Sequence, residues 1–548
     1  MKKKSFALAT SVALVSSAFL AACSTTDSND TSSGDKGSDK KSSEQTLNLI
    51  ESADIPTLNP TTSTDAVSFN VLNNTMEGLY RLDDKQQPTP GIAESHTVSD
   101  DKLTYTFKLR DAKWSDGTPI TAKDFEYAWK EVLNPDNASQ YAYVFYNIEG
   151  AEEYNTKKGE RDAVGVKAVD DKTFEVKLKA PADYFLGLTG FGPFMPKSEE
   201  LSKKIGKDFG STADKSLYNG PFKLTEWTRE QGWKMVKNDN YWDKDSVKLN
   251  TINVKVVKEV ATGVNLYEKG DIDRAGLSSE FVAQFQDNKE FKTKGESTIF
   301  YLYLNTKVKA LNNEKIRRAI DMGYNKKGIT DVILANGSLP ANYIVPKDFA
   351  KDADGKDFRE KYPTFNEYNA DEAKKLWEEG LKEIGQKSVE LELLNYDSDD
   401  AKKIGEFLKG ELEKNLPGMK VTIKQQPFKN KLDLENKGDF EFSFAGWGPD
   451  YQDPMTFLDL FLTDGPYNRG KWSNKEYDKL IKDAQTQTDA AKRWSELQEA
   501  EKILLDSAAI SPVYQRGRAF LVKPYVKGVV EHNFGADFSY KWASIEGK

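Results

Sequence analysis

The sequence predicts an α/β protein built from two or more lobes. The chain has 548 residues, which is more than one ordinary hydrophobic core accommodates. Segments with strand-like alternation and segments with helix-like periodicity follow one another along the chain. We find no internal repeat of the kind that builds solenoids or propellers. This mixed order favours α/β lobes over an all-α or an all-β fold.

Three strands are predicted in the amino-terminal half. A half-buried strand alternates apolar and polar side chains, because successive side chains point to opposite faces. This pattern occurs in TLNLI (46–50), LTYTFKL (103–109) and residues 173–179. We expect the folded body to begin at the first of these strands.

A capped helix is predicted between the second and third strands. Thr121 is followed three residues later by Asp124, which is typical of a helix amino terminus. Phe125, Trp129 and Val132 then recur at helical spacing and share one face. We expect that face to be buried.

The carboxy-terminal half alternates predicted helices and strands. Glycines interrupt the first helical stretch, and strands flank the last helix. In chain order we expect helical segments within 314–334 broken at Gly323 and Gly328, a capped helix at 369–380, a strand at 389–394, a helix at 401–416 and a strand at 421–423.

The amino terminus predicts secretion and lipid attachment. MKKK (1–4) precedes an apolar stretch at 6–20, which is shorter than the roughly 20 residues that a membrane-spanning helix needs. LAAC (20–23) contains the only cysteine, Cys23, and resembles the lipobox of bacterial lipoproteins. That resemblance implies removal of a signal peptide at 1–22 and acylation of the Cys23 thiol. A plain signal peptide with an incidental cysteine is the alternative.

The segment 24–45 is predicted to be a flexible tether. It contains no aliphatic or aromatic side chain, so it has nothing to contribute to a hydrophobic core. Together with Cys23 it forms a lipid-anchored stretch, residues 23–45, that would hold a globular body near a membrane surface.

Composition excludes several classes of function. The chain carries 78 basic and 87 acidic residues, whereas a nucleic-acid groove needs a clustered basic surface. Two isolated histidines, His96 and His532, supply neither a metal site nor a Ser-His-Asp triad. Gly-x-Ser-x-Gly and Walker A motifs do not occur. We therefore predict no catalytic residues, no metal, no cofactor and no nucleic-acid partner, which favours a binding protein.

One segment of the carboxy-terminal third joins a strand to unusual residues. FSFAGWGPDYQDP (442–454) begins as an apolar strand, and Phe440, Phe442 and Phe444 share one of its faces. We expect these rings to cover a core or the wall of a cleft.

Two glycines and one acid follow in the same segment. Continued alternation places Gly446, Gly448 and Asp450 on one face, and the glycines leave that face bare. A bare strand with free backbone groups allows another backbone to pair with it as an added strand. Asp450 then accepts a charge-assisted hydrogen bond from the α-ammonium group of a peptide. The alternative is a strand, a glycine bend and an acidic residue on the surface.

The body as a whole resembles a known family. The matching motifs extend over nearly its whole length. They are TLNP (57–60), TMEGLY (75–80), GIAE (91–94), LTYTFKLR (103–110), WSDGTPITA (114–122), NGPFKL (219–224), NYW (240–242), GDID (270–273), LNT (304–306) and IRRAI (316–320), together with the segment at 442–454. On these motifs the chain is identified as a member of the peptide-binding lipoproteins of bacterial ABC importers, the oligopeptide- and dipeptide-binding proteins of solute-binding protein family 5.

The resemblance implies a two-lobed, clam-like periplasmic-binding-protein fold with three domains. Its first lobe is discontinuous in sequence, two crossing segments form the hinge, and the peptide is enclosed between the lobes. The expected order is the first part of lobe I at 46–76, a small extra domain on that lobe at 77–200, the second part of lobe I at 201–300, lobe II at 301–512 and a return to lobe I at 513–548.

The resemblance also implies which residues bind the ligand. They are Asp450 at the peptide amino terminus, Gly446, Trp447 and Gly448 for main-chain pairing and a pocket wall, and the aromatic residues Tyr141, Tyr301 and Phe428. Tyr141 and Tyr301 match aromatic pocket positions of the family, and Phe428 stands where some relatives carry tryptophan. Placement in an ordinary hydrophobic core is the alternative for these three rings.

The chain departs from the family pattern at the other end of the ligand. Some members hold the carboxylate of the peptide with arginines, and the approximate counterparts here are Glu435 and Phe444. We therefore expect peptides to be gripped at the amino terminus, with length less constrained at the other end.

The implied function is that of a monomeric, lipid-anchored substrate-binding protein. It captures oligopeptides at the outer face of the bacterial cytoplasmic membrane, attached through Cys23, and delivers them to the permease subunits of an ABC transporter. The alternatives are a surface hydrolase, a binder of an oligosaccharide and a receptor for a signalling peptide.

Overall fold

The computed structural model describes residues 45–548 of the chain. The predicted signal peptide at 1–22, the acylation site Cys23 and the predicted tether up to residue 44 lie outside the described residues. The body begins with β1 (Thr46–Glu51), as predicted. Within the described part, no helix combines the length and the apolar character that crossing a membrane requires.

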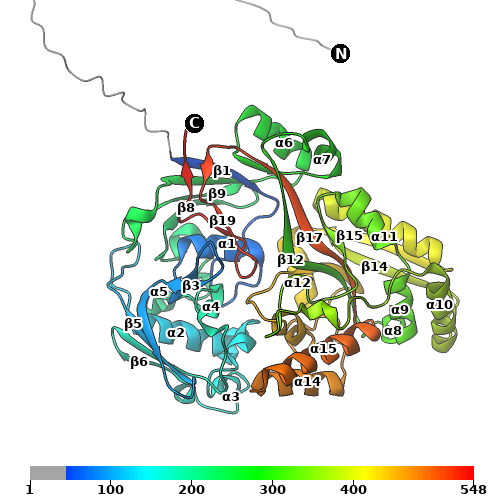
Figure 1. The fold of residues 1–548 in the computed structure, drawn as a ribbon, viewed down its shortest axis with the longest axis horizontal. Helices are drawn as coiled ribbons and strands as arrows, with labels where there is room; N and C mark the ends of the chain where they lie inside the picture. Colours follow the sequence, from blue (N-terminus) through cyan, green and yellow to red (C-terminus); the bar gives the residue numbers. More distant parts are fainter. Residues whose placement is uncertain (1–44) are drawn as a thin grey trace, which may run out of the picture. The chain divides into compact units, whose positions relative to one another are not determined.

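Two four-stranded sheets lie on one side of the body (Figure 1). In the first, β1 pairs in parallel with β10 (Thr251–Val256), and the antiparallel strands β9 (Gly232–Lys237) and β8 (Phe222–Thr228) follow. The second has the order β4-β5-β7-β6 and consists of Ala93–Val98, Thr104–Leu109, Thr173–Lys177 and Val166–Asp170. The predicted strands at 103–109 and 173–179 are thus confirmed as β5 and β7, which pair with each other.

Helix α2 (Ala122–Leu133) packs beside the second sheet. Its amino terminus is the predicted capping box, in which Thr121 and Asp124 satisfy each other's backbone groups. Phe125 and Trp129 have no exposed surface, so the predicted buried face is confirmed.

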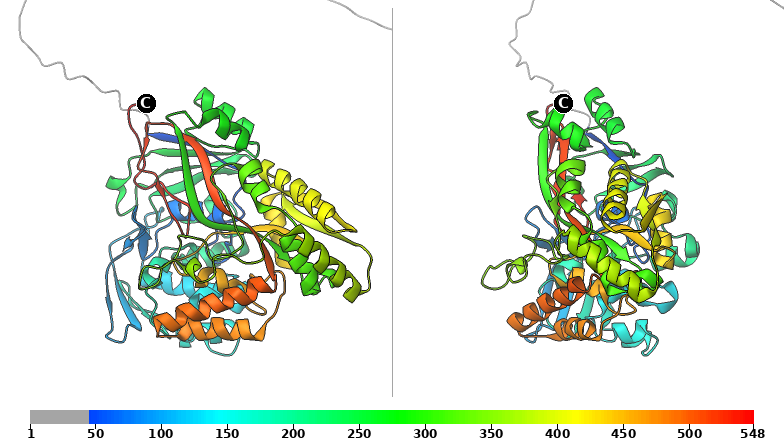
Figure 2. Two further views of the ribbon diagram at one scale, coloured as in Figure 1. Left: turned by 45° about the vertical axis from the view of Figure 1, so that its right-hand side comes forward. Right: turned by 90° about the vertical axis from the view of Figure 1, so that its right-hand side faces the viewer.

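The largest sheet has seven strands. Their order is β11 (Arg274–Gly276), β17 (Ile510–Val522), β12 (Phe291–Leu304), β16 (Phe442–Trp447), β14 (Val389–Tyr396) and β15 (Met419–Gln426), with β13 (Leu339–Pro340) also paired to β17. The long strands β12 and β17 pair antiparallel and run side by side through the body (Figures 1 and 2). The sequence positions 300/301 and 512/513, where the chain is expected to cross between lobes, lie within these two strands.

Helices of the carboxy-terminal half cover this sheet and extend beside it (Figure 2). They are α9 (Glu314–Met322), α10 (Ala370–Ile384), α11 (Asp399–Asn415), α14 (Lys475–Thr486) and α15 (Ala490–Asp506), with a π-helical turn at Gly328–Leu334. The predicted break at Gly323 is confirmed, because α9 ends there.

One predicted helix end is wrong. Helix α10 begins at its Asn369 cap, as predicted, but it continues past Gly380 to Ile384. A Cβ atom at Gly380 would lie 2.6 Å from Cγ1 of Ile316 on α9. The glycine therefore allows two helices to pack closely and does not end either of them.

The remaining elements are short. The helices are α1 (Ala66–Thr75), α3 (Ala151–Asn155), α4 (Phe185–Leu188), α5 (Glu199–Ile205), α6 (Val260–Lys269), α7 (Ser279–Phe285), α8 (Lys309–Asn312), α12 (Phe428–Lys437) and α13 (Met455–Leu458). The strands are β2 (Tyr80–Leu82), β3 (Pro88–Pro90), β18 (Val526–Lys527), β19 (Val530–Glu531), β20 (Phe538–Ser539) and β21 (Ser544–Ile545).

Strands β12 and β16 separate two hydrophobic cores. Alternation along each strand sends successive side chains to opposite faces. Tyr301 and Trp447 belong to the core that includes both four-stranded sheets, whereas Leu302 and Phe444 belong to the core formed with α9, α10 and α11. The aromatic residues on the first of these faces are therefore positioned where the sheets meet.

A buried ion pair ties the carboxy-terminal tail to the end of α1. The guanidinium of Arg81 donates to Oε2 of Glu77 through Nε and Nη2, at 2.9 and 2.8 Å, and to Oγ of Ser539 on β20 at 3.2 Å. The Oη of Tyr241 donates to the same Glu77 oxygen at 3.0 Å. Glu77 and Arg81 are both buried, so each charge depends on the other.

We predict that Arg81→Met destabilises the protein by about 3–5 kcal/mol, because it leaves the Glu77 carboxylate buried without its cation. Urea unfolding of the two proteins measures the difference. Lys123→Met is the matched control, since Lys123 forms an exposed pair with Asp171 and such pairs contribute little. Equal loss of stability in both variants would contradict the role of the buried pair.

Candidate functional site

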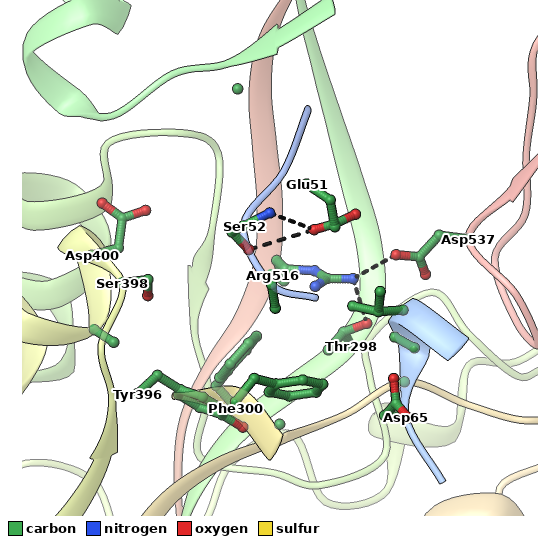
Figure 3. Close-up of a pocket in the computed structure, with 18 of the residues that line it drawn as sticks. Glu51, Ser52, Asp65, Thr298, Phe300, Tyr396, Ser398, Asp400, Arg516 and Asp537 are labelled. Carbon is green, nitrogen blue, oxygen red and sulfur yellow. Dashed lines mark hydrogen bonds and ion pairs between the residues drawn. The ribbon is translucent and has the colours of Figure 1, made fainter. Parts of the chain in front are cut away.

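A cavity of about 570 Å³ lies where the sheets meet. Its wall is formed by β1, the start of α1, β12, β16, β17, the start of α12 and the segment 396–401. Figure 3 shows part of this wall, with the Arg516 guanidinium directed toward Thr298 and Asp537, at 3.2 and 3.6 Å. All seven residues that the sequence assigned to ligand binding line this one cavity: Tyr141, Tyr301, Phe428, Gly446, Trp447, Gly448 and Asp450.

Strand β16 presents an edge to the cavity. It pairs with β12 from Phe442 to Trp447, but its pairing with β14 extends only to Ser443. The strand ends at Trp447, so the alternation that was expected to reach residue 450 stops three residues earlier. Asp450 therefore enters the cavity from the loop that follows β16.

The face of β16 at Gly446 is covered, contrary to the expected bare face. Phe300 is the register partner of Gly446 on β12. A Cβ atom at residue 446 would lie 2.9 Å from a ring carbon of Phe300, which itself stacks on Phe444 and Tyr514. Glycine at this position makes room for the Phe300 ring in the cavity wall. The ring covers a face of the strand, and the backbone edge beyond Ser443 is still not paired with β14.

Asp450 is buried in this wall and is not a surface acid. Its side chain accepts a hydrogen bond from the Oη of Tyr141 at Oδ1, at 3.0 Å, and its backbone N–H donates to Oγ1 of Thr456 at 2.9 Å. The other carboxylate oxygen, Oδ2, is buried without a hydrogen-bond partner among residues 45–548. Burial raises the pKa of Asp450 well above its ordinary value, because only the Tyr141 hydroxyl stabilises the charged form.

Aromatic rings surround this carboxylate. Tyr141 stacks on Trp447 at a centroid distance of 6.4 Å, and Trp447 meets Tyr467 edge-on at 4.7 Å. The indole N–H of Trp447 donates to the carbonyl of Thr456 at 3.0 Å, which fixes the ring. The rings thus exclude water from the space beside Asp450.

The two other predicted aromatic residues lie farther along the wall. Tyr301 donates from its Oη to the Oη of Tyr303 at 2.8 Å and is almost fully buried. Phe428, the first residue of α12, stacks on Tyr396 with centroids 5.9 Å apart. Both rings also belong to the packing around the larger core, so they line the cavity and contribute to the core at the same time.

Sequence reasoning missed a charged group in the same wall. The resemblance places Glu435 where some relatives carry a carboxylate-binding arginine, and the sequence suggested no other role for it. Its carboxylate oxygens lie 2.5 Å from Nζ of Lys431 and 2.7 Å from Nη1 of Arg469, and all three side chains are buried. Arg469 and its neighbour Tyr467 come from a loop without regular periodicity. No local signal in the sequence marks either residue as part of a cavity.

Contacts between distant segments hold parts of the cavity wall together. Nζ of Lys258 lies 2.9 Å from Oδ2 of Asp397, and the backbone N–H of Val260 donates to Oδ2 of Asp399 at 3.3 Å. On another side, the N–H of Gly535 donates to the carbonyl of Pro449 at 2.8 Å. These contacts join the segment before α6 and the carboxy-terminal tail to segments that follow β14 and β16.

Both histidines lie outside this cavity wall. Nδ1 of His96 is hydrogen-bonded to the Oη of Tyr80 at 2.6 Å, and Nδ1 of His532 lies 3.3 Å from Oε1 of Gln86. In the described part of the chain, no three residues among histidine, cysteine, aspartate and glutamate are grouped closely enough to hold a metal ion.

Comparison with known proteins gives matches over most of the chain. The family model described as bacterial extracellular solute-binding proteins, family 5 Middle, matches residues 87–469. The dipeptide-binding protein DppE of Bacillus subtilis is 37% identical over 506 residues, which is 92% of this chain and 92% of that protein.

Solved structures are similar to this chain over the same share of its length. The substrate-binding domain of an oligopeptide ABC transporter from Bacillus anthracis has a TM-score of 0.91 and 47% identity, covering 92% of this chain and 99% of the other. OppA of Listeria monocytogenes bound to peptide has a TM-score of 0.89 and 43% identity over the same shares. The predicted two-lobed α/β clam is confirmed by these similarities. The chain belongs to family 5 of the bacterial extracellular solute-binding proteins.

Proposed function

We propose that this protein captures oligopeptides in the cavity described above and delivers them to the permease of an ABC importer. The relatives named as dipeptide- and oligopeptide-binding proteins support a peptide ligand. The lipobox-like LAAC at 20–23 supports attachment of the protein through Cys23 to the outer face of the cytoplasmic membrane. In this proposal the protein is a monomeric receptor without catalytic activity.

The single observation that carries the proposal is the unpaired Oδ2 of buried Asp450. A carboxylate removed from water is costly unless a cation or a donor reaches it. The α-ammonium of a peptide supplies both, and a charge-assisted hydrogen bond of this type contributes about 1.5–3 kcal/mol. We infer that Asp450 holds the amino terminus of the peptide, with Tyr141 orienting the carboxylate through Oδ1.

The open edge of β16 supports recognition of the peptide main chain. Beyond Ser443 this edge faces the cavity without pairing to β14, and an extended ligand can add to it as a strand. Backbone pairing reads no side chains, so it accepts many sequences. The rings of Trp447, Tyr301 and Phe428 then provide the surface against which ligand side chains pack.

Closure of the two lobes follows from ligand contacts on both sides. A ligand that touches both lobes favours the closed state over the open one by the difference in its binding free energy to the two states. In this proposal the Lys258–Asp397 pair and the Val260–Asp399 hydrogen bond link the two lobes and favour the closed state.

We predict that Asp450→Asn lowers the affinity for an unmodified peptide by about tenfold or more, because the amide no longer neutralises the ammonium group. Calorimetry measures the dissociation constants. Acetylation of the peptide amino terminus should weaken binding to the original protein but should have little further effect on the variant.

Asp65→Asn is the matched control for this experiment. Asp65 is a second buried acid of the cavity wall, and its Oδ1 caps α1 by accepting from the N–H of Ser68. Asparagine keeps that cap and removes the charge. Binding that is lost in Asp65→Asn and retained in Asp450→Asn would show that Asp65, and not Asp450, holds the amino terminus.

A second prediction concerns the stability of the ligand-free protein. The pKa of Asp450 is raised in the folded state, so the folded state binds this proton more tightly than the unfolded chain does. Stability is therefore lost as the pH rises from the unfolded value of about 3.9 through the folded pKa. Asp450→Asn should raise the thermal midpoint at pH 7, and the advantage should shrink toward pH 4. A pH-independent difference in calorimetric scans would contradict this.

A third prediction concerns ligand length. If the amino terminus is the principal anchor, peptides that share their first residues but differ in length should bind within a few-fold of one another. Calorimetry on one sequence shortened from its carboxyl end makes the comparison. A sharp affinity optimum at one length would show that the other end is held equally firmly.

A further inference from the structure

A buried ionic cluster with an excess of positive charge lines the cavity. Lys431, Glu435 and Arg469 are 0%, 1% and 7% exposed. The Nζ of Lys431 and an Nη of Arg469 lie 2.5 and 2.7 Å from opposite oxygens of the Glu435 carboxylate. Two cations thus share one anion. The two cations lower the pKa of Glu435 although burial opposes this, and burial lowers the pKa of Lys431. With all three side chains in their ordinary charged forms, the cluster carries one net positive charge.

Both carboxylate oxygens of Glu435 accept hydrogen bonds within the cluster, whereas one N–H of Arg469 has no acceptor. Oε1 of Glu435 accepts from Lys431 and from Oγ of Ser443 at 2.6 Å, and Oε2 accepts from Arg469. Nε of Arg469 is buried and has no acceptor among residues 45–548. Lys431 alone would neutralise Glu435, so the Arg469 guanidinium is a surplus cation with unused hydrogen-bonding capacity.

Arg469 lies close to the proposed amino-terminal anchor. Its Cζ is 5.4 Å from the ring centroid of Tyr467, and that ring is 5.5 Å from the ring of Tyr141, whose hydroxyl holds Asp450. Arg469, Tyr467, Tyr141 and Asp450 all line the cavity. A negative and a positive group therefore lie on either side of two contacting tyrosine rings, Tyr141 and Tyr467, in the wall of one cavity.

We propose that Arg469, supported by Lys431 and Glu435, forms a subsite for a carboxylate of the bound ligand. The inference rests on the proposed peptide-binding function and names a preference within it. The carboxylate comes from an acidic side chain near the amino end of the peptide, because Arg469 lies beside the proposed amino-terminal anchor. A carboxylate placed against the guanidinium neutralises the excess charge and accepts from its free N–H groups.

The first arm of the test compares acidic and neutral side chains. Peptides amidated at the carboxyl end carry glutamate or glutamine at the second or third residue and are otherwise alanine. By calorimetry, the original protein should bind one glutamate peptide about tenfold or more tightly than its glutamine counterpart. In Arg469→Gln, which leaves the Lys431–Glu435 pair intact, this ratio should fall to about two or less.

The second arm compares terminal groups. Di- and tripeptides of alanine are measured with a free and with an amidated carboxyl end. The free acid and the amide should bind within about twofold of each other, because the subsite takes a side chain. A preference for the free acid that disappears in Arg469→Gln, equal affinities of the glutamate and glutamine peptides, or a glutamate preference that survives in Arg469→Gln would overturn the inference.

Two controls separate this inference from folding and from the proposed function. Lys429→Gln removes an equal charge from the exposed side of α12, the helix that carries Lys431 and Glu435. It should keep the full preference, because Lys429 pairs with the half-exposed Asp433. The neutral amidated peptide reports on the remaining site, because its binding to Arg469→Gln shows that the variant is folded. If no peptide binds even the original protein, the proposed function fails; if neutral peptides bind without any preference, only the subsite fails.

Discussion

The desolvated carboxylate of Asp450 is the constraint on which the site depends. One oxygen is satisfied by Tyr141, and the other is buried in a ring-lined space without a partner among the described residues. Such an arrangement lowers the stability of the free protein, since burial favours the neutral acid. In the proposed function, a ligand cation or hydrogen-bond donor that reaches the unpaired oxygen offsets this cost.

The scaffold makes this arrangement possible by placing a strand end at a junction of sheets. Strands β12 and β16 send alternate side chains into two different cores, which fixes both faces of the wall. Pairing with β14 stops at Ser443, so the last part of β16 keeps a backbone edge toward the cavity. The loop that follows β16 then delivers Asp450, and a second loop, after α13, delivers Tyr467 and Arg469. A strand and two loops thus contribute different kinds of contact to one cavity.

Local patterns predicted most of the elements that form this scaffold. The capping box at Thr121 and the buried ring of Trp129 were readable because the determining residues lie within one helix. Two glycines were misread for the opposite reason. Gly380 packs against Ile316 of another helix, and Gly446 makes room for Phe300 of another strand. When only the local segment is considered, a glycine that allows a residue distant in sequence to pack closely is mistaken for a helix break or for a bare strand face.

The sequence by itself determined the α/β class, the family resemblance and the importance of the segment 446–450, because motifs and periodicity are local properties. The resemblance added Tyr141, Tyr301 and Phe428. Only the tertiary structure decided that Asp450 is buried, that Tyr141 reaches it across 309 positions of the chain, and that Glu435 is engaged by two cations. Burial and charge pairing depend on which distant segments pack together. Sequence spacing does not show which distant segments pack together, so the charges that line the cavity could be identified only from the tertiary structure.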